Sequence, residues 1–286
     1  MKKILILGGT GLLGAPVARR LQADDFAVRL LARDPGKARA NFDDSYEVVA
    51  GDATDFASLE NAMTGCDGVH ISIAGPAELP AAQHVAALAP RLGLERITHI
   101  SGATAFEQNR WFPMTAAKLA AEEAIRASCV PFTIFCPTWP MEMLPRYARG
   151  GQPLMIGDQP LPVHWFAADD MARMISDAYR RAEAANKKLF VHGPEVITTV
   201  EALERYCRAF HPSVQSVALM PIDAARGMAA STGNQMLGYF AELMAYFEKV
   251  GELGDPAEAN ELLGAPAITL DTWLEQRKAQ MVGGAS

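Results

Sequence analysis

Three glycines near the start of the chain stand where a backbone could bind a phosphate group. Gly8, Gly11 and Gly14 follow the apolar run at residues 4–7, which has the composition of a strand buried on both faces. Glycines at this spacing let the backbone turn sharply, approach a pyrophosphate and enter a helix whose first amides point at the phosphates. We expect Gly8, Gly11 and Gly14 to hold the pyrophosphate, and the predicted cofactor-binding residues of this bend are Gly8, Thr10, Gly11, Leu12, Leu13 and Gly14. The alternative is a glycine-rich strand–helix turn that binds no ligand.

The end of the next predicted strand, residues 27–32, is where a dinucleotide site distinguishes NAD from NADP. An NAD site usually places a carboxylate there, about 20 residues past the glycines, to bind the ribose 2′-hydroxyl. This position is Ala32, and Arg33 follows it. A guanidinium matches the oxygens of a 2′-phosphate. The pair favours NADP as the cofactor, with NAD as the alternative; the competing interpretation is that Arg33 is a solvated loop charge.

Strands and helices alternate through the first half of the sequence and would position these groups. Strands are expected at residues 4–7, 27–32, 47–52, 69–75, 96–102 and 132–136, with helices between them, among them 56–63, 81–92 and 118–128. Such alternation predicts an α/β fold with a doubly wound parallel sheet, in which ligands lie beyond the carboxyl ends of the strands. The residues at those ends are Gly8 to Gly14, Arg33, Asp52, Ala74, Gly75, Ser101 and Gly102.

The second half is less regular and predicts a smaller, mostly helical subdomain. A last strand is expected at residues 188–192, and helices at 169–181, 198–210, 223–250 and 270–280. The methionines of the 223–250 helix, at Met228, Met236 and Met244, have the spacing of core residues. We expect a dinucleotide-binding domain at residues 1–195, with a loop excursion near 150–165, and a substrate-capping subdomain at residues 196–286.

Composition narrows the class of protein. Of 286 residues, 50% are hydrophobic and 21% are charged, which is typical of a globular protein. The net charge of −7 argues against binding to nucleic acid or an anionic membrane, and no apolar run reaches transmembrane length. Four scattered cysteines indicate a reducing, cytoplasmic compartment and no zinc site. His164 and His192 lack the spacing of metal ligands, so we expect no metal. The expected partner is a small-molecule substrate, and a homo-oligomer is allowed.

Taken together, the motifs resemble those of the NmrA-like group of atypical short-chain dehydrogenases/reductases, which have the Rossmann fold. The matching segments are residues 8–14, 31–35, 51–55, Lys118, 136–142, 166–172 and 192–198. The resemblance implies that Asp52 lies beside the adenine, and that Ala74 and Gly75 lie beside the nicotinamide ribose.

One departure from this family concerns the catalytic acid/base. Short-chain dehydrogenases usually carry Tyr-x-x-x-Lys on the helix after the fifth strand, but here the run is Met114 to Lys118, and methionine cannot transfer a proton. By resemblance, Lys118 serves as the acid/base, or only binds the ribose, or is a solvated helix charge. Ser101 and Thr104 could polarise a carbonyl; for Ser101 a local backbone hydrogen bond is the alternative.

These residues support two classes of function. The first is an NADP-dependent reductase that passes hydride between the nicotinamide and a small apolar carbonyl, quinone or enone. The second is a regulatory or structural protein that binds the dinucleotide without turnover, which the missing tyrosine would explain. A sugar-nucleotide epimerase is the remaining alternative, although epimerases of this superfamily depend on the same tyrosine.

Overall fold

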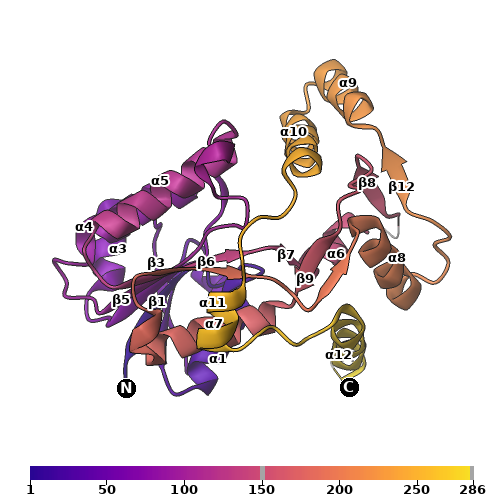
Figure 1. Cartoon of the computed structure of the whole chain (residues 1–286). Helices are drawn as coiled ribbons and strands as arrows, with labels where there is room; N and C mark the ends of the chain where they lie inside the picture. The colour runs from indigo at the N-terminus through magenta and orange to yellow at the C-terminus, as the bar shows by residue number, and fades with distance from the viewer. Residues whose placement is uncertain (149–151, 284–286) are drawn as a thin grey trace. The chain divides into compact units, whose positions relative to one another are not determined.

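The computed structural model describes residues 1–148 and 152–283 (Figure 1). Contacts group the chain into two compact units, each built from three separate segments. Unit 1 comprises Met1–Pro137, Ala168–Val191 and Gly254–Pro266, and unit 2 comprises Thr138–Ala167, His192–Leu253 and Ala267–Ser286. The single boundary at residue 195 stays a prediction about independently folding domains.

Unit 1 is built on a seven-stranded parallel sheet with the order β10-β6-β5-β4-β1-β2-β3. Its strands are β1 (Lys3–Leu7), β2 (Ala27–Ala32), β3 (Glu47–Ala50), β4 (Gly68–Ile71), β5 (Arg96–Ile100), β6 (Phe132–Pro137) and β10 (Lys187–Val191). The strand order reverses direction between β1 and β4, and this is the point at which ligands of such sheets bind. The predicted α/β doubly wound fold is confirmed.

Helices cover both faces of this sheet, because its central strands are apolar on both sides. On one face α3 (Phe56–Met63), α4 (Glu78–Leu88) and α5 (Pro113–Ala127) lie side by side, and on the other α1 (Gly14–Ala23) packs against α7 (Ala168–Arg180) and α7 against α11 (Ala257–Leu263) (Figure 1). The short helix α2 (Pro35–Arg39) follows β2. A cluster of buried side chains from β1, β4, β5, β6 and from α3, α4 and α5 fills the space between the sheet and these three helices.

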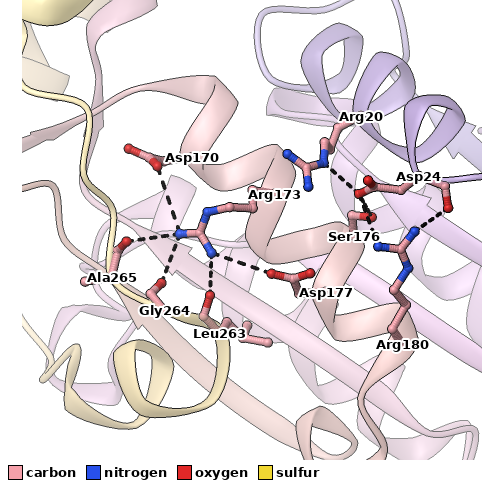
Figure 2. Close-up of polar contacts among 10 residues, drawn as sticks. All are labelled: Arg20, Asp24, Asp170, Arg173, Ser176, Asp177, Arg180, Leu263, Gly264 and Ala265. Carbon is pink, nitrogen blue, oxygen red and sulfur yellow. Dashed lines mark hydrogen bonds and ion pairs between the residues drawn. The ribbon is translucent and has the colours of Figure 1, made fainter.

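Charged side chains link α7 to α1 on one side and to the end of α11 on the other (Figure 2). Asp24 Oδ2, at the end of α1, accepts hydrogen bonds of 2.6 Å from Arg20 Nε and from Ser176 Oγ of α7. On the other side of α7, Arg173 donates to the carbonyls of Leu263, Gly264 and Ala265 where α11 ends. These bonds satisfy carbonyls that the helix itself leaves without donors.

In its described residues, unit 2 combines two small sheets with five α-helices, of which α6 is a single turn. One sheet has the order β11-β9-β7 and the other pairs β12 with β8. The strands are β7 (Trp139–Pro140), β8 (Leu154–Ile156), β9 (Val163–Phe166), β11 (Glu195–Ile197) and β12 (Ala218–Met220). The helices are α6 (Leu144–Tyr147), α8 (Thr199–Phe210), α9 (Ile222–Thr232), α10 (Gln235–Val250) and α12 (Leu270–Gly283). Part of the expected loop excursion at 150–165 is therefore β8 and β9, while residues 150 and 151 lie outside the described residues.

The methionine-rich segment differs from its prediction in two ways. It forms two helices instead of one, because Gly233 takes a left-handed conformation with φ +66° and ends α9, while Asn234 caps α10 by accepting from the Leu237 amide. Only Met244 is buried; Met228 and Met236 are 48% and 63% exposed. The expectation that all three methionines are core residues is wrong, since each helix turns only one face inward.

No helix in the described part of the chain combines the length and the apolar character needed to cross a membrane.

Candidate functional site

The glycine bend after β1 has the close backbone packing that the sequence predicts. The Gly11 amide donates to the Gly8 carbonyl at 2.9 Å, which closes the turn. Gly8 has φ +83°, and a Cβ added there would lie 2.3 Å from the Ser72 carbonyl oxygen. A Cβ on Gly14 would lie 2.2 Å from the Gly8 carbonyl oxygen. Only glycine fits at these two positions, so the bend, the exit of β4 and the start of α1 are held together.

The first turn of α1 presents its backbone amides at this bend. Leu13 stands at the N-cap, and no described side chain caps the helix there. The first amides of a helix lack partners within the helix and carry part of its dipole, so they bind anions. Thr10 and Gly11, at the tip of the bend, are exposed. This arrangement has the features that the sequence analysis predicts for a pyrophosphate site.

Two polar residues lie at the carboxyl ends of β2 and β3. Arg33 is exposed directly after β2, and next to it Asp34 caps α2 by accepting from the Lys37 amide. Asp52 Oδ1 accepts from the amide and the hydroxyl of Thr54, both at 2.8 Å. These hydrogen bonds, aided by the charge of Arg33, hold the pKa of Asp52 below its usual value. A guanidinium and an ionised carboxylate therefore share this corner of the sheet.

A buried ion pair lies on the other side of the reversal point. Lys118 of α5 donates to Oε1 and Oε2 of Glu78, at 3.0 Å and 3.1 Å. The side chains are 13% and 3% exposed. His99 Nε2, from β5, lies 3.4 Å from Glu78 Oε1. Although burial favours the neutral acid, the Lys118 charge and the adjacent His99 hold the pKa of Glu78 below its usual value.

Lys118 reaches the carboxyl end of β5 over a glycine. A Cβ added to Gly102 would lie 3.6 Å from both Cδ and Cε of Lys118, so the aliphatic part of the lysine passes over this backbone. Met114 lies one turn earlier on α5, which puts it on the same helix face as Lys118. The position of the usual tyrosine is thus occupied by a partly buried thioether.

Ser101, the second predicted catalytic residue, is already engaged in hydrogen bonding. Its hydroxyl donates to Glu122 Oε1 at 2.6 Å, and Glu122 Oε2 lies 2.8 Å from Lys188 Nζ. The expected alternative of a local backbone bond is replaced by this longer-range side-chain contact. Thr104, the other hydroxyl considered, is buried.

The fold gathers the predicted residues at one edge of the sheet in unit 1. Ala74 and Gly75 are exposed after β4, beside the glycine bend, and Glu78 follows in the first turn of α4. Glu78 was missed because the helix was expected from residue 81. The Gly75-Pro76 pair, which favours a turn and then a helix start, was the available signal. The roles of individual residues toward a cofactor stay predictions.

A family comparison decides what kind of site this is. Residues 8–182 match the model of a family described as NAD(P)H-binding, and this span covers the glycine bend, the Lys118–Glu78 ion pair and most of the sheet. The chain belongs to the NAD(P)H-binding family. Its cofactor is a nicotinamide dinucleotide, and the resemblance drawn from the sequence motifs is confirmed at this level.

Known members resemble the chain over most of their length. It is 31% identical over 228 residues, 78% of this chain and 79% of the relative, to (4-alkanoyl-5-oxo-2,5-dihydrofuran-3-yl)methyl phosphate reductase of Streptomyces griseus. It is 26% identical over 248 residues, 84% of both chains, to NAD(P)H azoreductase of Xenophilus azovorans. Among solved structures, NADPH-dependent quinone oxidoreductase of Escherichia coli in complex with NADPH shares the fold, with a TM-score of 0.76, 21% identity and coverage of 96% and 99%. The chain thus falls in a family of NAD(P)H-dependent reductases.

Proposed function

We propose that this chain is an NADPH-dependent reductase whose substrate is a small apolar carbonyl, quinone or enone. Three reductases that resemble it act, by their names, on a quinone, an azo compound and an oxo-dihydrofuran that bears an alkanoyl group. All of these acceptors are conjugated and poor in electrons. The observation that carries the proposal is Lys118, a lysine ammonium held at the carboxyl end of β5 by Glu78, in a family that binds nicotinamide dinucleotides.

Each part of the site would have a separate role. The amides at residues 8–14 would bind the pyrophosphate, Asp52 would lie beside the adenine, and Ala74 and Gly75 beside the nicotinamide ribose. The bound cofactor supplies the hydride. Lys118 would orient the ribose and donate the proton that completes the reduction, because methionine at position 114 has none to give. Ser101 stays a second candidate, since it could polarise a carbonyl only by exchanging its bond to Glu122.

NADPH is proposed over NADH because of Arg33. Its exposed guanidinium follows the end of β2, which is the position that usually contacts the 2′ group in this fold, and Ala32 offers no carboxylate for a free 2′-hydroxyl. Arg33→Ala is expected to weaken NADPH binding about tenfold or more, the loss of one charge-assisted hydrogen bond, and to leave NADH binding nearly unchanged. Fluorescence titration measures both affinities. Arg39→Ala, which removes another exposed arginine a few residues away, is the control and should keep the wild-type ratio.

Turnover is tested by mixing the purified chain with NADPH and a panel of quinones, enones and aldehydes, while the absorbance of reduced nicotinamide is followed. Lys118→Met is expected to keep NADPH binding measurable and to lower kcat on the order of 100-fold, the usual contribution of an acid/base group. Tight binding of NADPH with no turnover across the panel would overturn the reductase proposal.

A nucleotide-sensing or structural role is the second candidate. The absence of tyrosine between Tyr46 and Tyr147 favours it, because the usual proton donor of the superfamily is missing. The same panel of substrates distinguishes the two functions, since a sensor binds the dinucleotide without consuming it.

For either function, we infer that the protein acts in the cytoplasm, a reducing compartment, because its four cysteines are free.

A further inference from the structure

Unit 2 brings together three potential metal ligands that are far apart in the sequence. His164 lies in β9, His192 precedes Gly193 and Pro194, and Glu252 follows the end of α10. One ligand atom from each residue lies within 4.8 Å of those of the other two. The sequence predicted no metal site because the three residues are separated by 28 and 60 positions, and metal motifs are recognised by short spacings.

Backbone packing fixes the place of both histidines. A Cβ added to Gly193 would lie 1.7 Å from the Trp165 carbonyl oxygen, so the glycine lets the chain beside His192 touch β9. Strand β11 then pairs with β9, with Val196 opposite His164. The two imidazole rings lie with centroids 4.8 Å apart and planes tilted by 35°.

Glu252 is aimed at His164 by two hydrogen bonds. Its Oε1 accepts from the His164 backbone amide at 2.6 Å, and its Oε2 lies 2.7 Å from His164 Nδ1. The carboxylate is thus anchored through one oxygen, while the other faces the imidazole. The His164 and Glu252 side chains are 32% and 13% exposed, which leaves an ion a path from solvent.

We propose that His164, His192 and Glu252 form a binding site for one divalent transition-metal ion of the Zn²⁺ type. Two imidazoles and one carboxylate are a common ligand set for Zn²⁺ and its neighbours, whereas Mg²⁺ and Ca²⁺ prefer oxygen ligands alone. The ion would sit between His164 and Oε2 of Glu252, and Oε1 would keep its bond to the backbone amide. With Zn–N and Zn–O bonds of about 2.1 Å, tetrahedral ligand atoms lie about 3.4 Å apart. His164 Nδ1 and Glu252 Oε2, now 2.7 Å apart, would separate slightly, and the His192 ring would move toward them. Side-chain rotation supplies both movements. Water would fill the fourth position.

The metal joins three segments of unit 2 and therefore stabilises the folded chain. The competing explanation is that the Glu252–His164 hydrogen bonds serve packing alone. The two explanations differ in whether the metal-free protein binds Zn²⁺ in a 1:1 ratio: a metal site would, and hydrogen bonds that serve packing alone would not.

Calorimetric titration of the chelator-treated full chain with ZnCl₂ tests the proposal. We expect one Zn²⁺ per chain, and at least tenfold weaker binding in each of His164→Gln, His192→Gln and Glu252→Gln. His211→Gln, a partly exposed histidine of the same unit outside the cluster, is the control and should bind as the wild type does. MgCl₂ should give no comparable binding. A wild type that binds no stoichiometric Zn²⁺, or cluster variants that bind it unchanged, would overturn the proposal.

A second measurement needs no variant and covers the case in which one fails to fold. His164 is exposed enough to react with diethylpyrocarbonate, and mass spectrometry locates the modified residue. One equivalent of Zn²⁺ should protect His164 in the wild-type chain and leave His211 as reactive as before. Equal modification of His164 with and without Zn²⁺ contradicts the site.

Discussion

Lys118 and Glu78 form a two-oxygen ion pair, with Nζ 3.0 Å from one carboxylate oxygen and 3.1 Å from the other. The pair joins α5 to the first turn of α4, across 40 positions in the sequence. A carboxylate that is only 3% exposed keeps its charge here because the ammonium offsets the cost of burial. Glu78 therefore determines where Lys118 points, which gives the carboxylate a positioning role in the proposed reductase.

The first prediction concerns this pair. Glu78→Gln leaves the Lys118 ammonium buried without its counter-charge, so folding stability should fall by about 1–3 kcal/mol. The lysine also loses its fixed orientation, and kcat should fall about tenfold or more, since small misplacements of a catalytic group are costly. Stopped-flow kinetics and urea unfolding measure these effects.

Asp24→Asn is the matched control for the Glu78 variant. Asp24 is also a poorly exposed carboxylate in an ion pair, but it lies in the α1–α7 layer (Figure 2). This variant should lose stability and keep the wild-type kcat. If both variants lower stability alike and the Glu78 variant keeps the wild-type kcat, the positioning role is wrong.

Local sequence signals predicted much of the fold. Strand β2 and helix α3 have the expected bounds. Asp34 and Thr198 cap the helices that follow them by accepting a hydrogen bond from an amide three residues on. The glycine bend was also recognisable, because a positive φ and close backbone contacts restrict those positions to glycine. Each of these signals lies within a few residues of the structure that it specifies.

Contacts between distant side chains could not be predicted in the same way. Glu78 meets Lys118 only after the strands are ordered, and no spacing in the sequence encodes that meeting. The cluster of His164, His192 and Glu252 arises from sheet pairing and from Gly193 in the same manner. The exposure of Met236 depends on which face of α10 turns inward, and the helical period alone leaves that choice open.

The second prediction tests the glycine bend. Gly14→Ala places a Cβ 2.2 Å from the Gly8 carbonyl oxygen, and because both partners are backbone, the bend and α1 must separate. Binding of NADPH, measured by fluorescence titration, should weaken about tenfold or more, a cost of about 1.4 kcal/mol. Gly227→Ala in α9 is the control: a Cβ there meets nothing within 4 Å, and the change should stabilise the chain by ~0.5–1 kcal/mol. Unchanged NADPH affinity in Gly14→Ala would exclude the bend as the pyrophosphate site.

The third prediction concerns the end of α11 (Figure 2). Arg173→Leu removes the donors to three successive carbonyls, at residues 263–265. The free energy of unfolding should fall by about 1–3 kcal/mol, and hydrogen exchange of residues 257–266 should speed up more than that of β1. The control is Arg181→Leu, which alters an exposed arginine just beyond the end of α7, the helix that carries Arg173. It should leave the hydrogen exchange of residues 257–266 unchanged. Equal exchange in both variants would mean that other contacts hold the segment.

The fourth prediction is the pH dependence of stability set by His70. This histidine is fully buried in β4, with Nδ1 2.8 Å from Thr98 Oγ1, and burial together with the nearby His99 lowers its pKa from 6.5 to about 3. Below pH 6.5, His70 therefore binds a proton in the unfolded chain and stays neutral in the folded chain. The contribution of His70 to folding stability is complete above pH 6.5 and is lost as the pH falls. As pH falls from 6.5 toward 3, this single group should cost about 1.4 kcal/mol per pH unit.

Urea unfolding at intervals from pH 5 to pH 7.5 measures that slope, in a range where most carboxylates stay ionised in both states. His70→Gln has no group that titrates in this range, so its unfolding free energy should depend less steeply on pH than that of the wild type. The curves should therefore converge on acidification, because only the wild type must exclude a proton from its core. Parallel curves for the two proteins would show that His70 is protonated in the folded chain as readily as in the unfolded one, against its burial between β5 and β1.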